Sequence, residues 1–342
     1  MSEFFQHEVT QGIAAIRFNR PEKMNAFNYE MWLEFKKLID GFAKNKDAKA
    51  LFLFSTNPRF FSTGADMDEF ERKSGDKKWR AANFKAIRGA MDALINFPKP
   101  TVAGVSGLCL GGGLAIAAAC DIRYGEVSAK FSLPPAKIGL VYPFPEVKRL
   151  VELIGHSQAA ELLFTTRNID AKVARAMGLI TKVFVFDEYE KQLNLLAGQI
   201  SVLPPSSLIG LKQMLIRVAA GQQKDTKETE ALFLNSYDSD HFQKTMKMLR
   251  RKSEQIKVNQ AGEKAPDKTD GKAKTITTKI KPRPGVKPKS TPARAKAIPK
   301  PEKKSTAKAK AIPKPETKSK APQKSPKKSA AKAKSKAKAK KS

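Results

Sequence analysis

Two glycine-bearing turns, each placed directly after a strand-like apolar run, constrain the fold of this chain more than any other feature. The first has the sequence FSTGADM at residues 61–67, and the second has the sequence GLCLGGGLA at residues 107–115 and opens a helix-like run. A helix start presents unpaired backbone N–H groups at the positive end of the helix dipole. Two such turns can direct two N–H donors at one oxygen, so the sequence predicts an oxyanion hole for a carbonyl that gains negative charge.

Strand-like and helix-like segments alternate along the first part of the chain. Apolar runs at residues 14–18, 50–54 and 101–105 predict strands, and the continuous run at 50–54 predicts a strand buried on both faces. Asn28 can cap a helix with one apolar face, and residues 84–97 form a second predicted helix that prolines end. This alternation predicts an α/β architecture.

The segment that follows is predicted to be mostly helical. Asp170 can cap a short helix, with Gly178 just beyond its end. Another helix begins at the Pro204–Pro205 pair, and one long helix is expected over residues 226–257.

Charge divides the chain into two unlike parts. Residues 261–342 contain 28 Lys/Arg, 5 Asp/Glu and no Phe, Trp or Tyr, a net +23 within the +32 of the whole chain. Such a segment buries too little apolar surface to offset its ordering entropy, so we expect it to be disordered. Its Ala/Lys/Pro repeats and the SPKK sequence at 325–328 resemble tails of linker-histone type. Nucleic acid is the first expected partner; acidic membrane surfaces, acidic proteins or a merely solubilising role are the alternatives.

Cysteines and apolar run lengths bear on the compartment. Cys109 and Cys120 both lie in the apolar glycine-rich region, where buried and reduced thiols are expected, as in a cytosolic protein. The chain start is acidic rather than basic, and no apolar run reaches about 18 residues, so neither a secretory leader nor a membrane span is expected. No histidine and cysteine cluster has metal-ligand spacing, so no metal site is expected.

Five sequence blocks occur in a fixed order: RPEKMNA at 20–26, FSTGADM at 61–67, KPTVAGVSG at 99–107, LGGG at 110–113 and CDIRY at 120–124. Together they resemble the crotonase superfamily, the enoyl-CoA hydratase/isomerase family, over roughly residues 5–257. The resemblance implies an α/β spiral of repeated ββα units at residues 1–195. It also implies a helical region at 196–260 through which such proteins assemble as homotrimers or hexamers, ahead of the basic tail at 261–342.

The resemblance further implies an acyl-CoA site, with a coenzyme A thioester as substrate, no permanently bound cofactor and no metal. The oxyanion donors would be the backbone N–H groups of Ala65 and Gly112. Glycines around them let the backbone turn sharply and approach a ligand. Lys23 could meet a CoA phosphate, or it could be a plain surface lysine. The residues implied at the CoA thioester are Lys23, Met24, Ala26, Gly64, Ala65, Asp66, Met67, Gly111 and Gly112.

The acid and base residues depart from the family pattern. Hydratases of this family use two glutamates, whose positions fall here at Ala115 and Pro135. The aspartate of its dienoyl-CoA isomerases falls at Pro143. None of these side chains can transfer a proton, which argues against two-glutamate hydration.

Tyr142 and Glu146 are the remaining catalytic candidates. Tyr142 stands where methylmalonyl-CoA decarboxylases of the family carry a tyrosine, although that subgroup has a histidine at the position of Ala65; packing is the alternative role. Glu146 could act as a base, or it could be a solvated glutamate in a first helical turn. Asp66 and Asp68 are expected to stabilise the helix that follows the first glycine turn.

Two hypotheses about function follow. In the first, the chain is an acyl-CoA lyase or isomerase that stabilises a thioester enolate in a backbone oxyanion hole, with a methylmalonyl-CoA-decarboxylase-like reaction as a variant. In the second, the core is a catalytically weak platform whose basic tail binds nucleic acid. A cytoplasmic location is expected, with nucleoid or nuclear association through the tail as the alternative.

Overall fold

The strands form two sheets within residues 3–262, the part of the chain that the computed structural model describes, and from β3 to β8 successive strands alternate between them. The larger sheet has the strand order β1-β2-β3-β5-β7-β10, and the smaller has the order β4-β6-β8-β9. Only β1 against β2, and β8 against β9, pair antiparallel among these strands. The strands are β1 (Phe5–Thr10), β2 (Ile13–Phe18), β3 (Ala50–Ser55), β4 (Phe60–Ser62), β5 (Thr101–Val105), β6 (Leu108–Leu110), β7 (Ile122–Glu126), β8 (Lys130–Ser132), β9 (Ile169–Asp170) and β10 (Lys182–Phe184).

A strand–strand–helix unit recurs along the chain. In each of the pairs β3/β4, β5/β6 and β7/β8 the first strand joins the larger sheet, the second joins the smaller one, and a helix follows. This recurrence confirms the predicted α/β architecture. The helices are α1 (Tyr29–Lys44), α2 (Met67–Lys73), α3 (Lys77–Ile95), α4 (Gly112–Ala119), α5 (Phe144–Ile154), α6 (His156–Thr165), α7 (Ala171–Ala176), α8 (Phe186–Ser201), α9 (Pro205–Ala219), α10 (Lys227–Leu234) and α11 (Asp240–Gly262), with 3-10 turns η1 (Pro21–Lys23), η2 (Pro135–Ile138) and η3 (Asn235–Asp238).

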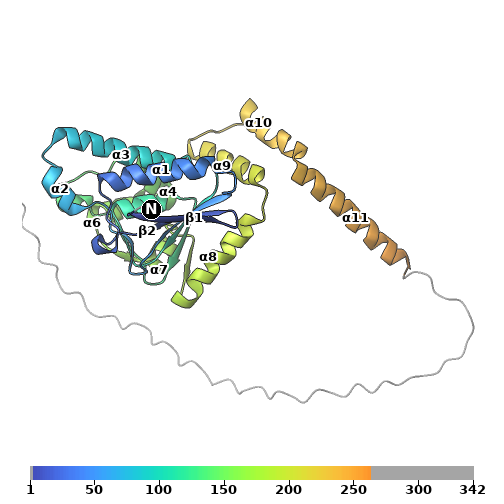
Figure 1. Cartoon of the computed structure of the whole chain (residues 1–342), viewed down its shortest axis with the longest axis horizontal. Coiled ribbons are helices and arrows are strands. Elements are labelled where there is room, and N and C mark those ends of the chain that lie inside the picture. Colours follow the sequence, from blue (N-terminus) through green and yellow to red (C-terminus); the bar gives the residue numbers. More distant parts are fainter. Residues whose placement is uncertain (1–2, 263–342) are drawn as a thin grey trace, which may run out of the picture. The chain divides into compact units, whose positions relative to one another are not determined.

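The central strands β3 and β5 of the larger sheet are buried on both faces, and β3 shows this residue by residue. Leu51 and Leu53 pack into the apolar cluster that includes α1 and α3, whereas Ala50 and Phe52 pack into the cluster that includes α8. Figure 1 shows α1 and α3 on one side of the sheet and α8 on the other. The continuous apolar run at residues 50–54 is thus explained, because successive side chains of a strand point to opposite faces.

The predicted helix caps are present. The side chain of Asn28 accepts a hydrogen bond from Met31 N at the start of α1, and Asp170 does the same for α7 from Val173 N. Gly178, just beyond α7, has a φ of +85°, a conformation that glycine adopts without a Cβ penalty.

Two predicted helices have different bounds. The helix expected at 84–97 begins earlier, at Lys77, because Asp76 caps it there. The single helix expected at 226–257 is wrong: α10 and α11 are separated by η3 and Ser239. The hydroxyl of Ser236 donates back to Phe233 O, and Ser239 Oγ accepts from Phe242 N at the start of α11. Such local side-chain bonds compete with a continuous helix.

Three sequence-based predictions, on a membrane span, on the domain boundary and on the tail, are compared with the fold here. For the membrane span, none of the helices in the described part of the chain is both long and apolar enough to cross a bilayer. The domain boundary predicted between residues 195 and 196 falls within α8 and stays a prediction. The predicted tail lies outside the described residues from 263 onward.

Candidate active site

The two glycine-bearing turns lie against each other. A Cβ on Gly64 would lie 2.7 Å from the nitrogen of Gly112 and 2.9 Å from the carbonyl oxygen of Leu110. In the other direction, a Cβ on Gly112 would lie 3.7 Å from the carbonyl carbon of Gly64, the atom bonded to the nitrogen of Ala65. The start of α4 therefore lies beside the peptide that carries the Ala65 N–H.

Ala65 and Gly112 have backbone N–H groups that are not used by the fold. The backbone N–H groups of the two residues that flank Ala65 form hydrogen bonds within the fold. Gly64 N donates to Ser62 Oγ at 3.2 Å, and Asp66 N donates to Phe27 O at 3.0 Å. Within residues 3–262 no acceptor is bound by the N–H of Ala65 or by that of Gly112, the first residue of α4. Both residues are partly exposed, so the two donors can meet a ligand oxygen.

Glycine is required at this contact for two physical reasons. Gly64 and Gly111 have φ values of +95° and +49°, which residues with a Cβ rarely adopt. Gly113 packs so closely that a Cβ there would lie 2.3 Å from the carbonyl oxygen of Ser62. The glycines therefore both shape the second turn and let it touch the first.

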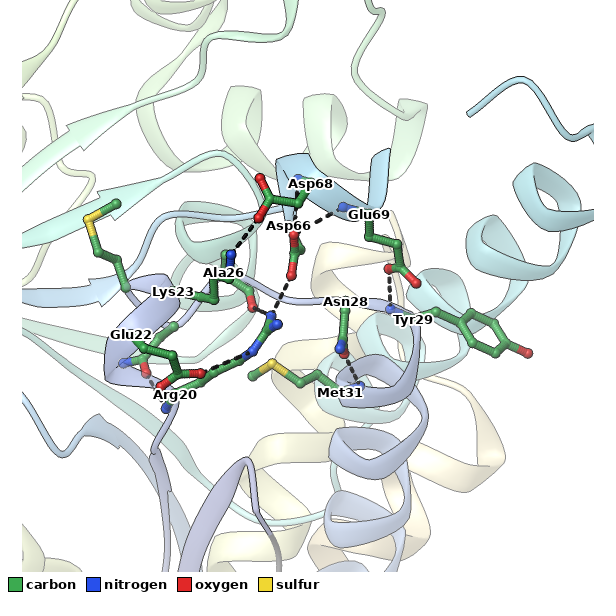
Figure 2. A network of polar contacts seen from close by, with 12 residues as sticks. Arg20, Glu22, Lys23, Ala26, Asn28, Tyr29, Met31, Asp66, Asp68 and Glu69 are labelled. Carbon is green, nitrogen blue, oxygen red and sulfur yellow. Dashed lines mark hydrogen bonds and ion pairs between the residues drawn. The ribbon is translucent and has the colours of Figure 1, made fainter. Parts of the chain in front are cut away.

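A buried polar network holds the first turn in place (Figure 2). The Arg20 guanidinium donates to Asp66 Oδ2 at 2.7 Å and to the carbonyl oxygen of Ala26 at 2.9 Å. Asn25 Nδ2 donates to Ser55 Oγ at 2.8 Å, and Asn25 O accepts from Ser62 Oγ at 2.7 Å. The RPEKMNA block thus supports the turn that carries Ala65.

Asp66 caps α2 and is held as a carboxylate. Its Oδ1 accepts from the N–H groups of Asp68 and Glu69, both at 3.1 Å, as expected for a capping aspartate. Burial alone would raise the pKa of Asp66, but the Arg20 hydrogen bond and the two N–H donors lower it further than burial raises it. Asp68 pairs with Lys23 instead, as Figure 2 shows.

Tyr142, between η2 and α5, donates its hydroxyl to the carbonyl oxygen of Gly111 at 2.8 Å. This carbonyl belongs to the peptide whose N–H is that of Gly112. Burial, followed by the nearby Glu146 and Cys109, raises the pKa of Tyr142 far above its usual range. The hydroxyl is therefore protonated at neutral pH and acts as a donor.

Glu146, in the first turn of α5, is buried rather than solvated. Its Oε1 pairs with Arg88, which also pairs with Asp92, whereas its Oε2 has no hydrogen-bond partner within the described residues. The Glu146 side chain and Ala115 both line a small cavity of about 10 Å³. Burial raises the pKa of Glu146 more than Arg88 lowers it.

The other positions named in the sequence analysis differ in exposure and in their place in the fold. Met24 and Met67 expose apolar side chains next to the first turn, while Ala26 is buried. Pro135 begins η2, and Pro143 precedes α5. Across residues 3–259, no group of three or more His, Cys, Asp or Glu side chains is placed to hold a metal ion.

A cavity of about 560 Å³ lies elsewhere, on the face of the larger sheet that α8 covers, and includes Phe54, Gly104 and Tyr189 in its lining. None of the predicted site residues lines this cavity. It is therefore separate from the contact between the two turns.

Sequence reasoning missed Arg88, Ser62 and the structural role of Asn25. Ser62 and Asn25 stand inside the quoted blocks, and their small polar side chains are typical of turn-supporting hydrogen bonds. The pairing of Arg88 with Glu146 gave no local signal, because the two residues are 58 positions apart in the sequence.

Comparisons with known proteins identify the family of this chain. Residues 8–257 match the sequence profile of the family described as enoyl-CoA hydratase/isomerase. The chain is 27% identical over 226 residues to the peroxisomal Delta(3,5)-Delta(2,4)-dienoyl-CoA isomerase of Arabidopsis thaliana, covering 63% of this chain and 81% of that protein. It is 33% identical over 193 residues to the mitochondrial methylglutaconyl-CoA hydratase of Homo sapiens, covering 55% of this chain and 56% of that protein.

Among solved structures, an enoyl-CoA hydratase/isomerase family protein from Hyphomonas neptunium superposes with a TM-score of 0.70 at 30% identity, covering 73% of this chain and 95% of that one. The family profile spans well over half of the chain. The chain belongs to the enoyl-CoA hydratase/isomerase family, within the crotonase superfamily.

Proposed function

We propose that this protein acts on acyl-CoA thioesters and stabilises a thioester enolate at the N–H groups of Ala65 and Gly112. One observation carries the proposal: two contacting turns hold two backbone donors that nothing within residues 3–262 accepts. Donors fixed in advance stabilise developing charge without reorganising during the reaction, and each is worth about 100- to 1000-fold in rate. The family membership supports the choice of a thioester as the carbonyl compound.

Glu146 is proposed as the acid–base residue. It lines the same small cavity as Ala115, the position at which the resembled hydratases carry a glutamate. A carboxylate with one unpaired oxygen and a raised pKa can take a proton from one carbon and return it to another. With Ala115 and Pro135 at the two glutamate positions, this one-carboxylate transfer favours an isomerase-type reaction over two-glutamate hydration.

The CoA moiety is proposed to contact the two turns and the RPEKMNA block. The exposed side chains of Met24 and Met67 offer apolar surface beside Ala65. Lys23 is already paired with Asp68, so contact with a CoA phosphate would require it to exchange partners. We place the enzyme in the cytoplasm on the ground that Cys109 and Cys120 are both buried free thiols.

Titration calorimetry of the full chain with crotonyl-CoA, methylmalonyl-CoA and free CoA, followed by mass spectrometry of the products, tests this function. A product of unchanged mass that chromatography separates from the substrate supports the proposal, because mass alone does not distinguish an isomer from unreacted substrate. Gain of water or loss of carbon dioxide would instead replace the proposal with hydration or decarboxylation. Absence of binding by all three compounds would contradict the acyl-CoA reading.

Gly112 offers a matched pair of variants for the oxyanion hole. Gly112→Pro removes the donor N–H at the first helical position, where proline is compatible with the helix. Gly112→Ala keeps the N–H, and its Cβ would meet only ordinary contacts of 3.5 Å or longer. We expect turnover to fall by about 100- to 1000-fold in the proline variant alone. Equal turnover in both variants would contradict the role of this donor.

A second candidate function rests on the charge of residues 261–342, a net +23. We propose that this segment binds nucleic acid through phosphate contacts, with affinity that falls steeply as salt rises. Binding of duplex DNA to the full chain and to a chain ending at residue 260 tests it, at 50 and 200 mM salt. Equal binding by both chains, or binding indifferent to salt, would contradict it.

A further inference from the structure

We infer that Tyr142 is a positioning residue that holds and polarises the Gly111–Gly112 peptide, so that the Gly112 N–H is a stronger donor to the substrate oxygen. This inference rests on the proposed function and deepens it. Its basis is the hydrogen bond from the Tyr142 hydroxyl to Gly111 O at 2.8 Å. The hydroxyl is committed to the backbone, on the far side of the same peptide group from the substrate.

The Gly111–Gly112 peptide is fixed from several directions. Its carbonyl oxygen accepts from Ala115 N at 3.1 Å, the first bond of α4, in addition to Tyr142. One residue earlier, Gly111 N donates to Ser132 O at 2.9 Å. Gly111 itself has φ +49° and ψ −119°, a conformation that the chain adopts only with support. Tyr142 supplies the side-chain part of that support.

The hydrogen bonds form a chain that runs through the peptide: Tyr142 O–H to Gly111 C=O, then Gly112 N–H to the substrate oxygen. A donor at the carbonyl end draws electron density toward that oxygen and makes the N–H at the other end more acidic. Such cooperative strengthening amounts to roughly 10–30% per bond. The effect grows as negative charge develops on the substrate oxygen, so it favours the transition state over the bound ground state.

The surroundings of Tyr142 keep the hydroxyl protonated. The charged or titratable groups that act on it are Glu146, from α5, and Cys109, from β6. Neither of them supplies a positive charge that would favour a tyrosinate. The Tyr142 hydroxyl therefore remains a hydrogen-bond donor at neutral pH.

The test is infrared spectroscopy of butyryl-CoA, labelled with ¹³C at the thioester carbonyl and bound at saturation to the full chain. The stretching frequency should fall on binding to the wild-type protein. In Tyr142→Phe we expect this lowering to shrink by roughly 10–30%, with a dissociation constant within about threefold of wild type. Tyr189→Phe is the matched control, because Tyr189 is also a partly buried tyrosine with a raised pKa and lines the separate cavity beside α8. It should leave the frequency unchanged.

An unchanged frequency in Tyr142→Phe would overturn the inference while leaving the oxyanion hole intact. If the wild-type complex itself shows no lowering, the proposed function fails, and the inference with it. Where Tyr142→Phe does not fold, 3-fluorotyrosine at position 142 repeats the test with the opposite sign. This more acidic phenol is a stronger donor and should lower the frequency further than tyrosine does; no further lowering would overturn the inference.

Discussion

The adjacent glycines Gly112 and Gly113 of the second turn differ in how much space they leave for a side chain. A Cβ on Gly113 would stand 2.3 Å from Ser62 O and 2.8 Å from Ser62 Cβ, whereas a Cβ on Gly112 would meet nothing closer than 3.5 Å. We therefore expect Gly113→Ala to destabilise the protein by about 1–3 kcal/mol through overpacking. Gly112→Ala should change stability by less than about 1 kcal/mol. Urea unfolding of both variants measures the difference, and equal stabilities would contradict this packing argument.

The charges around Glu146 set the pH dependence of the proposed proton transfer. A base works only after losing its proton, and burial raises the pKa of Glu146 above the ordinary value of 4.5, so the rate should rise with pH through that raised pKa. Arg88 lowers this pKa and Asp92 raises it. Arg88→Met should therefore move the rising limb to higher pH, and Asp92→Asn should move it to lower pH.

The measurement for this pair is the incorporation of deuterium at the α-carbon of butyryl-CoA, followed by mass spectrometry across the pH range. Glu146→Gln provides the baseline, because it keeps the shape and removes the base. If the rising part of the pH–rate profile stays at the same pH in both charge variants, a group other than Glu146 controls the rate.

At this scale, residues within one turn were predictable and residues joined by the fold were not. The glycine turns, and the helix caps formed by Asn28 and Asp170, depend only on residues a few positions away. They could therefore be predicted from the sequence. The bonds from Tyr142 to Gly111 and from Arg88 to Glu146 span 31 and 58 positions, and only the folding of the whole domain brings these residues together.

At the scale of elements, α2 is held to the first turn by Asp66. This side chain caps α2 and pairs with Arg20, whose side chain is only 14% exposed. Asp66→Ala should cost about 1–3 kcal/mol, because it removes a cap and the buried carboxylate partner of a largely buried guanidinium, which keeps only Ala26 O and the exposed Glu22. Asp76→Ala is the matched control: Asp76 caps α3 through Lys78 N at an exposed position, and its loss should cost about 0.5–1 kcal/mol.

Asp66 also gives the stability a defined pH dependence. Its folded pKa lies below the ordinary value of 3.8, so its contribution is fully present above that value and is lost as pH falls through the folded pKa. The stability difference between wild type and Asp66→Asn, from denaturant unfolding at successive pH values, should shrink only under acidic conditions. A difference that does not change with pH would contradict the ionised pair.

Element boundaries were less predictable than element types. The strands at 50–54 and 101–105 were expected from apolar runs, and each appears within one residue of its predicted bounds. The break between α10 and α11 was not expected, because apolar periodicity continues across it while Ser236 and Ser239 bond locally to the backbone. Periodicity reports which face is apolar, and it does not report where side chains interrupt the backbone ladder.

At the scale of the whole molecule, repetition builds the candidate site. Each ββα unit delivers a turn at the end of its second strand: β4 leads into the turn of Ala65, and β6 leads into the turn of Gly112. Because β4 and β6 are parallel neighbours in the smaller sheet, the two turns emerge side by side. In the proposed function, these two donors from separate units act on one oxygen.

Helix α9 exposes a stripe of apolar side chains, which predicts that the protein self-associates. Leu211, Leu215 and Val218 stand at positions i, i+4 and i+7 of this helix and are 64%, 62% and 68% exposed. Exposed apolar side chains at helical spacing favour burial against another chain, at about 1.5–3 kcal/mol for each fully buried side chain. Sedimentation velocity of the full chain should therefore show the trimer or hexamer expected from the family resemblance. Leu215→Glu should weaken the assembly by at least about tenfold, whereas Ser206→Glu, which adds the same charge to the exposed first turn of α9, should not. A monomeric wild type, or equal behaviour of the two variants, would show that this stripe is not an interface.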